Sequence, residues 1–505
     1  MWLKQLSKRW LPCWATGTES SKPRRQAAPR RYRQLTVEQL EDRMVPSNFT
    51  AATVSDLIAD INAANLASGS NSITLVAGNT FSLTAVDNIT DGATGLPVIA
   101  ANDNLIILGN GDTIARSTAA GTPAFRLFDV EAGAALDLFG LTLQNGLASG
   151  VGDSAWGGAI YSAGTLTLSF VTVQNNTAQG LNGTAGTDDT SANNPTGGAG
   201  GNGQDAFGGG LYIAGGTVNL LTDAFLGNNA QGGNGGDGGT AGMNTATNKI
   251  TSSSGAGGNA GNAGSAYGGA LYLVQGTVTV EGGKIDGNSA QGGAGGSGGN
   301  AGADGGSAVG GVGGSAGSAY GGALYLAHGI VTVEGSEVDG NSAQGGAGGS
   351  GGSTVGDGGS ATSGNGANGG KGIGGALEVA AGTVTLSDGA LSSNSARGGH
   401  GGTGGIALES GSAAATSGDG ADGGSASGGA LYVGQLGTVT LSNEYLNGNS
   451  AQGGSAGSGG IDEGMIDPNK SLGGGTGGSA GSGGAAYGGA LYVTERSVLS
   501  GTTLT

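Results

Sequence analysis

Apolar and polar residues alternate over short runs in much of the chain. In the segment GGALYLVQGTVTVEGGKIDGNSAQG, Leu271 and Leu273 stand two residues apart, and Val278 and Val280 repeat this spacing. A third run is centred on Ile285, just before an Asp-Gly-Asn turn. A spacing of two is typical of strands, and no run reaches the length of a helix. The pattern predicts three short strands separated by glycine-containing bends.

This pattern recurs along the chain as an array. A GGAIY, GGGLY, GGALY or GGALE signature begins at Gly157, Gly208, Gly268, Gly321, Gly374, Gly428 and Gly488. By subtraction, successive copies start 51 to 60 residues apart. One copy is too small to bury its own apolar face, whereas stacked copies close a common core, as in a solenoid. The predicted fold is all-β: a right-handed parallel β-helix with glycine-rich insertions between its coils.

Two residue types recur at fixed places in the repeat and predict side-chain ladders. The last position of the signature holds Tyr161, Tyr212, Tyr272, Tyr325, Tyr432 and Tyr492, and Glu378 breaks the series. The turn after the third strand carries Asn176, Asn228, Asn288, Asn341, Asn394 and Asn449. Stacked asparagines can hydrogen-bond from one coil to the next, so we interpret both series as structural. A stripe of tyrosines that stacks on sugars is the alternative interpretation.

The paired motifs resemble those of the polymorphic outer membrane protein repeat. GGA[IL] is followed there by Phe-x-x-Asn, and residues 225–228 (FLGN) match this form as they stand. Other copies place Val, Ile or Leu where that motif has Phe. The resemblance covers about Gly157 to Thr505 and implies a β-helix displayed on a cell surface, often in adhesion. The C-terminal translocator barrel of that family has no counterpart here.

Three regions are expected from the patterning. Residues 1–47 form a basic leader, residues 48–150 a cap with the first coils, and residues 151–505 the array, whose seventh copy is incomplete. Thr53 to Leu66 is the one predicted helix, because Thr53 and Asp56 fit a capping box before an apolar face. We expect it to cover the open end of the solenoid; a partner-binding helix is the alternative.

The glycine-rich insertions, such as Gly292 to Ala319 and Gly398 to Ser427, hold almost no apolar anchor. Their composition predicts flexible segments that leave the solenoid at one corner and form a fringe on one face. The alternative is that each insertion folds as a thin coil of its own, against which the entropy of ordering glycine argues.

Charge is divided unevenly and restricts the partners. Ten of the 18 Lys and Arg residues but only four of the 36 acidic ones precede Val45, so the remainder is strongly acidic. An acidic body disfavours nucleic acid, because phosphate binding requires a basic surface. The sequence contains no run of 18 consecutive apolar residues, so no transmembrane helix is predicted. Cys13, the one cysteine, rules out a disulfide within the chain.

The basic leader ends in QLEDRMVPS (residues 39–47). It resembles the Leu-Glu-x-Arg-x-x-Pro-Ser segment near the start of many large exported planctomycete proteins. This resemblance implies export by an atypical leader to the cell surface or the extracellular space. An ordinary basic tail is the alternative.

Candidate chemistry is sparse. Asp286 and Asp339 are one repeat apart, Asp129 and Asp137 stand singly among apolar strands, and Asp188-Asp189 lies in an insertion. His328 and His400 share no repeat position. A lyase or hydrolase needs several carboxylates, or carboxylates with a base, on one face. We therefore predict no catalytic or metal residues, with a carbohydrate-active β-helix enzyme as the alternative.

Binding is the function that these observations favour. Acidic residues beside glycine in the insertions (Asp237, Asp304, Asp357, Asp419 and Asp422) raise the hypothesis of weak calcium binding, and no other cofactor is expected. We predict a structural or adhesive protein that contacts surface polysaccharide or matrix proteins many times along one rod.

Overall fold

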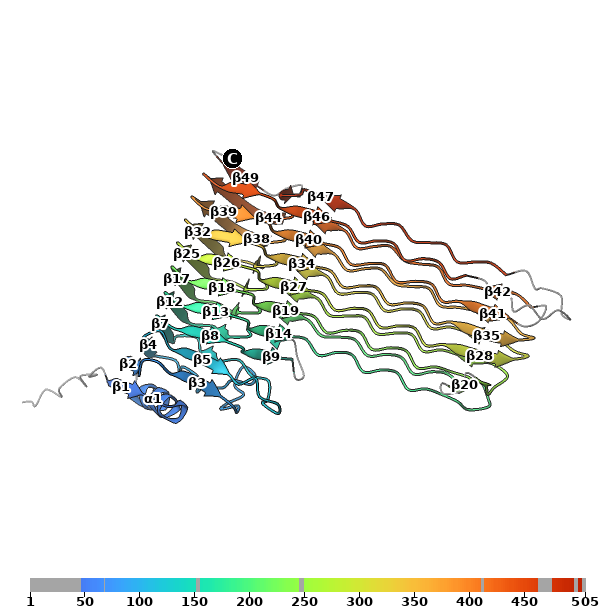
Figure 1. Cartoon of the computed structure of the whole chain (residues 1–505), viewed down its shortest axis with the longest axis horizontal. Coiled ribbons are helices and arrows are strands. Elements are labelled where there is room, and N and C mark those ends of the chain that lie inside the picture. The colour runs from blue at the N-terminus through green and yellow to red at the C-terminus, as the bar shows by residue number, and fades with distance from the viewer. Residues whose placement is uncertain are drawn as a thin grey trace, which may run out of the picture. The chain divides into compact units, whose positions relative to one another are not determined.

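The computed structural model describes residues 47–67, 69–150, 155–244, 249–409, 413–461, 475–494 and 498–501. Residues 1–46, which include nearly all of the predicted leader, lie outside the described residues. The described residues form a parallel β-helix solenoid from which a flat extension projects to one side (Figure 1). The predicted all-β solenoid with one short helix near its start is confirmed.

Helix α1 (Val54–Ala67) begins where the capping box predicts it. The Thr53 hydroxyl accepts the Asp56 N–H at 3.2 Å, and the Asp56 carboxylate accepts the Thr53 N–H at 3.0 Å. These bonds satisfy N–H groups that have no partner inside the helix. Leu57, Ile61 and Ala64 are buried against the first coils, so the helix packs against the N-terminal end of the solenoid.

The widest sheet has two ladders of parallel strands that merge in β38 (Leu377–Ser387) and β44 (Leu431–Ser442). The first ladder comprises β6 (Phe128–Val130), β11 (Ile160–Ser162), β16 (Leu211–Ile213), β24 (Leu271–Leu273), β31 (Leu324–Leu326) and β48 (Leu491–Val493). The second comprises β1 (Asn48–Ala51), β2 (Gly69–Leu75), β4 (Asp103–Leu108), β7 (Ala135–Phe139), β12 (Thr165–Ser169), β17 (Thr217–Leu221), β25 (Thr277–Glu281), β32 (Ile330–Glu334) and β49 (Val498–Gly501).

A nine-stranded sheet forms the next side of each coil. It comprises β3 (Thr80–Leu83), β5 (Thr113–Arg116), β8 (Thr142–Gln144), β13 (Thr172–Gln174), β18 (Ala224–Leu226), β26 (Lys284–Asp286), β33 (Glu337–Asp339), β39 (Ala390–Ser392) and β45 (Tyr445–Asn447). Alternate residues of these strands point inward, so Leu, Val, Ile and Phe fill one continuous core.

Two seven-stranded sheets lie where the extension leaves and rejoins the solenoid. The departing strands are β9 (Leu147–Ser149), β14 (Thr177–Gln179), β19 (Asn229–Gln231), β27 (Ser289–Gln291), β34 (Ser342–Gln344), β40 (Ser395–Arg397) and β46 (Ser450–Gln452). The returning strands are β10 (Ala155–Trp156), β15 (Ala206–Phe207), β23 (Ala266–Tyr267), β30 (Ala319–Tyr320), β37 (Gly372–Ile373), β43 (Ala426–Ser427) and β47 (Ala486–Tyr487). The apolar cluster between these two sheets consists of alanines in the part of the chain that the structure describes.

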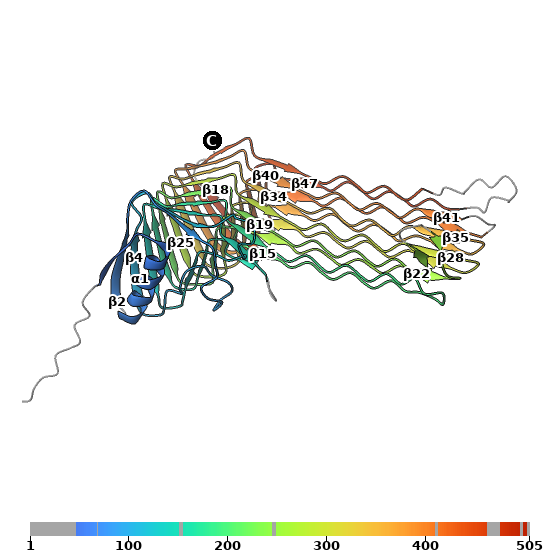
Figure 2. The same ribbon diagram turned by 60° about the horizontal axis from the view of Figure 1, so that its bottom comes forward.

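The glycine-rich insertions form the extension, which we call the glycine slab. Its outward segments are residues 180–188, 232–240, 292–300, 345–353, 398–406 and 453–461, and its return segments are 197–205, 257–265, 310–318, 363–371, 417–425 and 477–485. They leave the solenoid at one corner, as predicted, and lie side by side in two layers (Figure 2). The prediction that they are flexible is wrong.

Hydrogen bonds between segments explain this order. Outward residue Gly295 donates to Ala347 O of the next outward segment at 2.9 Å, and Gly296 donates to Gly261 O of the preceding return segment at 3.2 Å. A three-residue period with bonds only to neighbours is the pattern of polyproline-II-type helices. Glycine is required because a Cβ on Gly296 would lie 2.1 Å from Gly236 O. The hydrogen bonds between neighbouring segments offset the conformational entropy that glycine loses when it becomes ordered.

Short strands close the far end of the slab. A four-stranded sheet comprises β22 (Gly255–Ala256), β29 (Ala308–Val309), β36 (Ala361–Thr362) and β42 (Ala415–Thr416), and a three-stranded sheet comprises β28 (Ala301–Asp304), β35 (Thr354–Asp357) and β41 (Ala407–Glu409). One antiparallel pair joins β20 (Met243–Asn244) and β21 (Lys249–Ile250).

Candidate functional site

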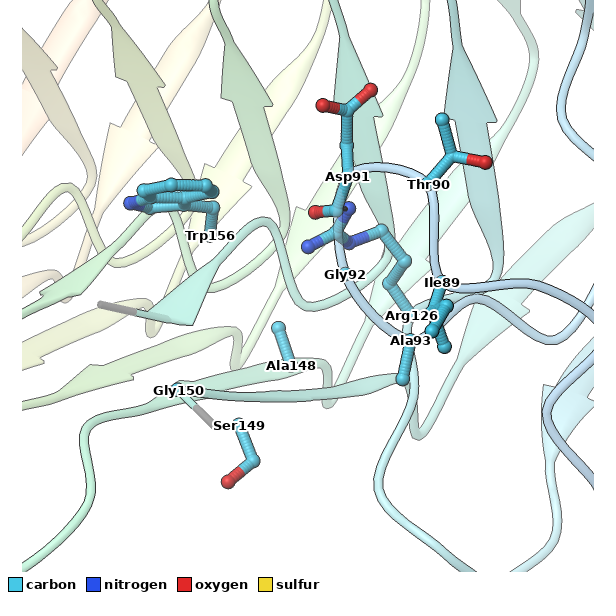
Figure 3. A pocket seen from close by; sticks show the side chains of 10 residues that line it. All are labelled: Ile89, Thr90, Asp91, Gly92, Ala93, Arg126, Ala148, Ser149, Gly150 and Trp156. Carbon is cyan, nitrogen blue, oxygen red and sulfur yellow. Dashed lines mark hydrogen bonds between the residues drawn. The ribbon is translucent and has the colours of Figure 1, made fainter. Parts of the chain in front are cut away.

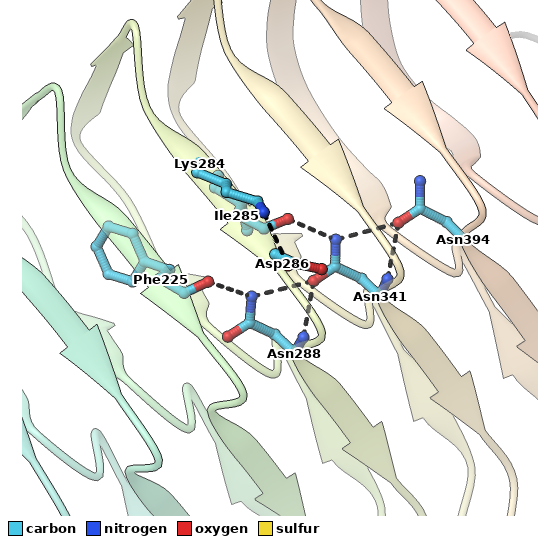
Figure 4. A network of polar contacts seen from close by, with 7 residues as sticks. All are labelled: Phe225, Lys284, Ile285, Asp286, Asn288, Asn341 and Asn394. Atoms are coloured by element: carbon cyan, nitrogen blue, oxygen red, sulfur yellow. Dashed lines mark hydrogen bonds and ion pairs between the residues drawn. The ribbon is translucent and has the colours of Figure 1, made fainter.

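The six repeated asparagines lie one above another inside the solenoid (Figure 4). The Asn288 amide donates to Asn341 Oδ1 at 3.0 Å and to Phe225 O at 2.9 Å. Its own Oδ1 accepts the N–H and the side-chain amide of Asn228. Asn288 is fully buried and all its side-chain donors and acceptors are used, so this ladder serves the turn and offers no atom to a ligand.

The repeated tyrosines form a stack on the outer surface of the solenoid. Tyr161, Tyr212, Tyr272 and Tyr325 have successive ring centroids 5.2 to 5.4 Å apart and nearly parallel planes. Each interior ring has a ring above and below it, so only its edges are accessible. Sugars pack on aromatic faces, and the interior of this stack therefore does not fit the sugar-stacking alternative.

A second aromatic column was missed at the sequence level. It lies directly before the glycine signature and contains Phe207, Tyr267 and Tyr320, with centroids 4.8 Å apart. Rings of the two columns meet edge to face across the Gly-Gly bend, as Tyr267 and Tyr325 do at 5.1 Å. Such contacts contribute roughly 0.5–1.5 kcal/mol each beyond burial. The two columns therefore fill the corner between solenoid and slab and brace one against the other.

Glu378 interrupts the tyrosine stack, in register between Tyr325 and Tyr432. It is 6% exposed, and its Oε2 has no hydrogen-bond partner. Burial raises the pKa of Glu378 well above its ordinary value. A protonated carboxyl is therefore favoured at this place.

Buried acids also occur at the corner that precedes the nine-stranded sheet. Asp223 accepts the N–H groups of Val171 at 2.7 Å and Leu221 at 2.9 Å, and burial raises its pKa to about 7. Glu444 accepts the Gly389 N–H at 3.2 Å, and burial raises its pKa to about 7 as well. In the coils between them, Ser336 accepts the Gly283 N–H in the same manner. These side chains satisfy backbone groups of the coil below.

The other acids that the sequence singled out do not converge. Asp286 and Asp339 are in register on neighbouring strands, and Asp286 pairs with Lys284 at 3.1 Å. In the described ranges, no three His, Cys, Asp or Glu side chains form a group that could hold a metal ion. His400 bonds Ser455 in the slab, whereas exposed His328 lies in the bend before β32.

Side chains on the slab faces have a structural task. Asp237 accepts the N–H of Ser297 on the next coil at 2.7 Å, and Asp422 accepts that of Ser482. Asn234, Asn262 and Asn365 do the same for their neighbours. Asp, Asn and Ser at every third position thus satisfy the one N–H per turn that no backbone carbonyl reaches. The calcium hypothesis for Asp237, Asp419 and Asp422 has this competing explanation.

One cavity lies at the N-terminal end of the aromatic columns (Figure 3). It has a volume of about 300 Å³ and is lined by Arg126, Trp156, the loop 89–93 and the end of β9. The Arg126 side chain is 4% exposed, its Nη1 donates to Asp91 O at 2.7 Å, and its Cζ lies 5.3 Å from the Tyr161 ring centroid. Burial lowers the pKa of this guanidinium.

Neither Arg126 nor Trp156 was predicted as a site residue. Arg126 lies in the coils before the array, which carry no repeat that would single it out, and Trp156 lies at the start of the array. The signal in the sequence was faint: Trp156 precedes the first glycine signature as Phe207 precedes the second.

Comparisons of the chain with protein-family models, with curated proteins and with solved structures find no match. The resemblance to the polymorphic outer membrane protein repeat and that of residues 39–47 to planctomycete export segments therefore stay predictions.

Proposed function

We propose that the chain is a structural and adhesive protein of a cell surface or extracellular matrix, which binds surface polysaccharide or matrix proteins without catalysis. Many weak contacts along one body add through effective concentration, so no single strong site is required. In the part of the chain that the structure describes, no helix could span a membrane.

The observation that carries this proposal is the order of the glycine slab. Its exposed positions recur in register on successive coils, for example Ser297 above Asp237 and Ser482 above Asp422. A contact made by one coil can be repeated by the next at the strand spacing of about 4.8 Å. The acidic composition supports solubility and disfavours nucleic acid as the partner.

The test is binding of the purified full chain to immobilised polysaccharides at several surface densities, with and without calcium. Multivalent adhesion predicts an apparent affinity that rises steeply with ligand density and no release of product. Affinity independent of density would contradict multivalency. New reducing ends or unsaturated sugars would instead support the enzyme alternative.

A further inference from the structure

The cavity beside Arg126 has the composition of a binding site rather than of a packing defect. Defects in a core are lined by apolar groups, whereas this cavity combines a guanidinium, a carboxylate (Asp91) and an indole. Ile89 also lines it and is 77% exposed. At about 300 Å³ it suits a small ligand.

Arg126 is held rigidly and keeps donors unused. The Asp91 carbonyl and the Tyr161 ring fix the guanidinium, and Gly92 allows its approach because a Cβ there would lie 2.9 Å from Nη2. Figure 3 shows the guanidinium on one side of the cavity and the Trp156 indole on the opposite side. The guanidinium has five N–H donors, and a ligand between the two side chains would meet those that the Asp91 carbonyl leaves.

Trp156 presents an aromatic face that the interior rings of the columns cannot. One side of its indole stacks on Tyr212 at 5.8 Å. The indole also lies 6.5 Å from the Tyr161 ring at a tilt of 38°. Its strand, β10, is the edge strand of its sheet, so among the described residues no further ring of the second column precedes Trp156. At this end of the columns, the apolar face of a ligand ring could therefore stack on the indole of Trp156.

We propose that this cavity binds one sugar residue of a neutral glycan, stacked on Trp156 and hydrogen-bonded through its hydroxyls to Arg126 and Asp91. A sugar has an apolar C–H face and hydroxyls that both donate and accept, which matches an indole opposite a donor and an acceptor. Asp91 and the acidic body disfavour an anionic ligand, although Arg126 alone would suit one. The inference rests on the proposed adhesive function and names its ligand class.

The test is isothermal titration of the full chain with neutral oligosaccharides selected on a glycan array, and with matched uronate-containing ones. We expect one site per chain for neutral ligands and a loss of affinity of at least about tenfold in Trp156→Ala. Ala148→Phe, which places a ring in the cavity from β9, where the Ala148 methyl points toward Arg126 and Trp156 (Figure 3), should abolish binding. Tyr445→Ala, which removes an exposed aromatic side chain elsewhere on the solenoid, should leave affinity unchanged.

Melting temperatures of the variants show whether each remains folded, and Ala148→Phe decides the matter if Trp156→Ala does not fold. Equal affinity in wild type and Ala148→Phe, binding of uronates alone, or no bound glycan would overturn the inference. The adhesive function is separable: if Ala148→Phe keeps density-dependent binding to a polysaccharide surface, the repeated contacts stand and the cavity site fails.

Discussion

The stacked coils are stabilised by different interactions in the solenoid and in the glycine slab. In the solenoid, inward residues such as Leu273, Val280 and Ile285 are buried in a continuous apolar core. In the middle of the slab, glycines of the two layers face one another and no large apolar side chain is buried between them. Hydrophobic burial dominates the first region and backbone hydrogen bonding the second.

The first outward segment of the slab (residues 180–188) shows why the later segments require glycine. Leu181, Thr184 and Thr187 occupy positions where later outward segments have glycine, as at Gly233, Gly236 and Gly239. No coil of the slab lies beneath them, so their side chains have room and are exposed. These side chains also cover an edge that could otherwise pair with another chain. Close approach of neighbours, not flexibility, therefore selects glycine.

The comparison predicts the largest effect for a bulky residue inside the slab. Gly296→Val should cost more than about 4 kcal/mol locally, because its Cβ would overlap Gly236 O and separate the layers. Hydrogen exchange should show lost protection in neighbouring slab segments while the solenoid stays protected. Ser297→Val is the matched control, since this side chain faces solvent; equal damage there would refute the explanation.

A polar deletion in the solenoid should have the next largest effect. Asn288→Ala leaves Phe225 O and the Asn228 N–H buried without partners, at a cost of about 3 kcal/mol in the free energy of unfolding. Denaturant unfolding measures this cost. Asn300→Ala removes one exposed bond to Ser353 and should cost less than about 0.5 kcal/mol. Similar costs for both variants would argue against a special role of the buried ladder.

The buried acids predict that the solenoid is less stable at alkaline pH. The pKa of Asp223 and of Glu444 is about 7 in the folded chain, above the ordinary values of 3.8 and 4.5, so the folded state binds more protons between these limits. Their stabilising contribution is complete below about pH 4 and is lost as the pH rises towards 7. The melting temperature should fall from pH 5 to pH 8, and Asp223→Asn with Glu444→Gln should flatten this slope. An unchanged slope would exclude these two acids as its cause.

The smallest expected effect is a gain. Glu378→Tyr would complete the stack between Tyr325 and Tyr432 and should stabilise the chain by about 1 kcal/mol. Glu378→Gln separates the loss of a buried carboxyl from the gain of a ring. If both variants shift the denaturant midpoint equally, stacking contributes nothing at this place.

The solenoid could be predicted because its apolar residues recur every second position. The order of the slab could not be predicted from composition, which treats glycine only as flexible. The informative signal was the period of three in GGAGGSGGN at residues 292–300, with a small or polar residue after each glycine pair. The repeats predicted the Asn and Tyr columns, whereas the Arg126 cavity depends on how non-repeated coils meet the array.

The equal length of the slab segments restricts how the gene can change. Every outward and return segment spans nine residues, whereas the tips between them vary from eight residues (189–196) to sixteen (241–256), which accounts for much of the unequal repeat length. Adding one residue within a segment would rotate all later glycines out of phase with both neighbouring coils. Insertions and deletions that preserve the fold should therefore fall at the tips. Within the slab segments, they should come in multiples of three residues and change the length of adjacent coils together.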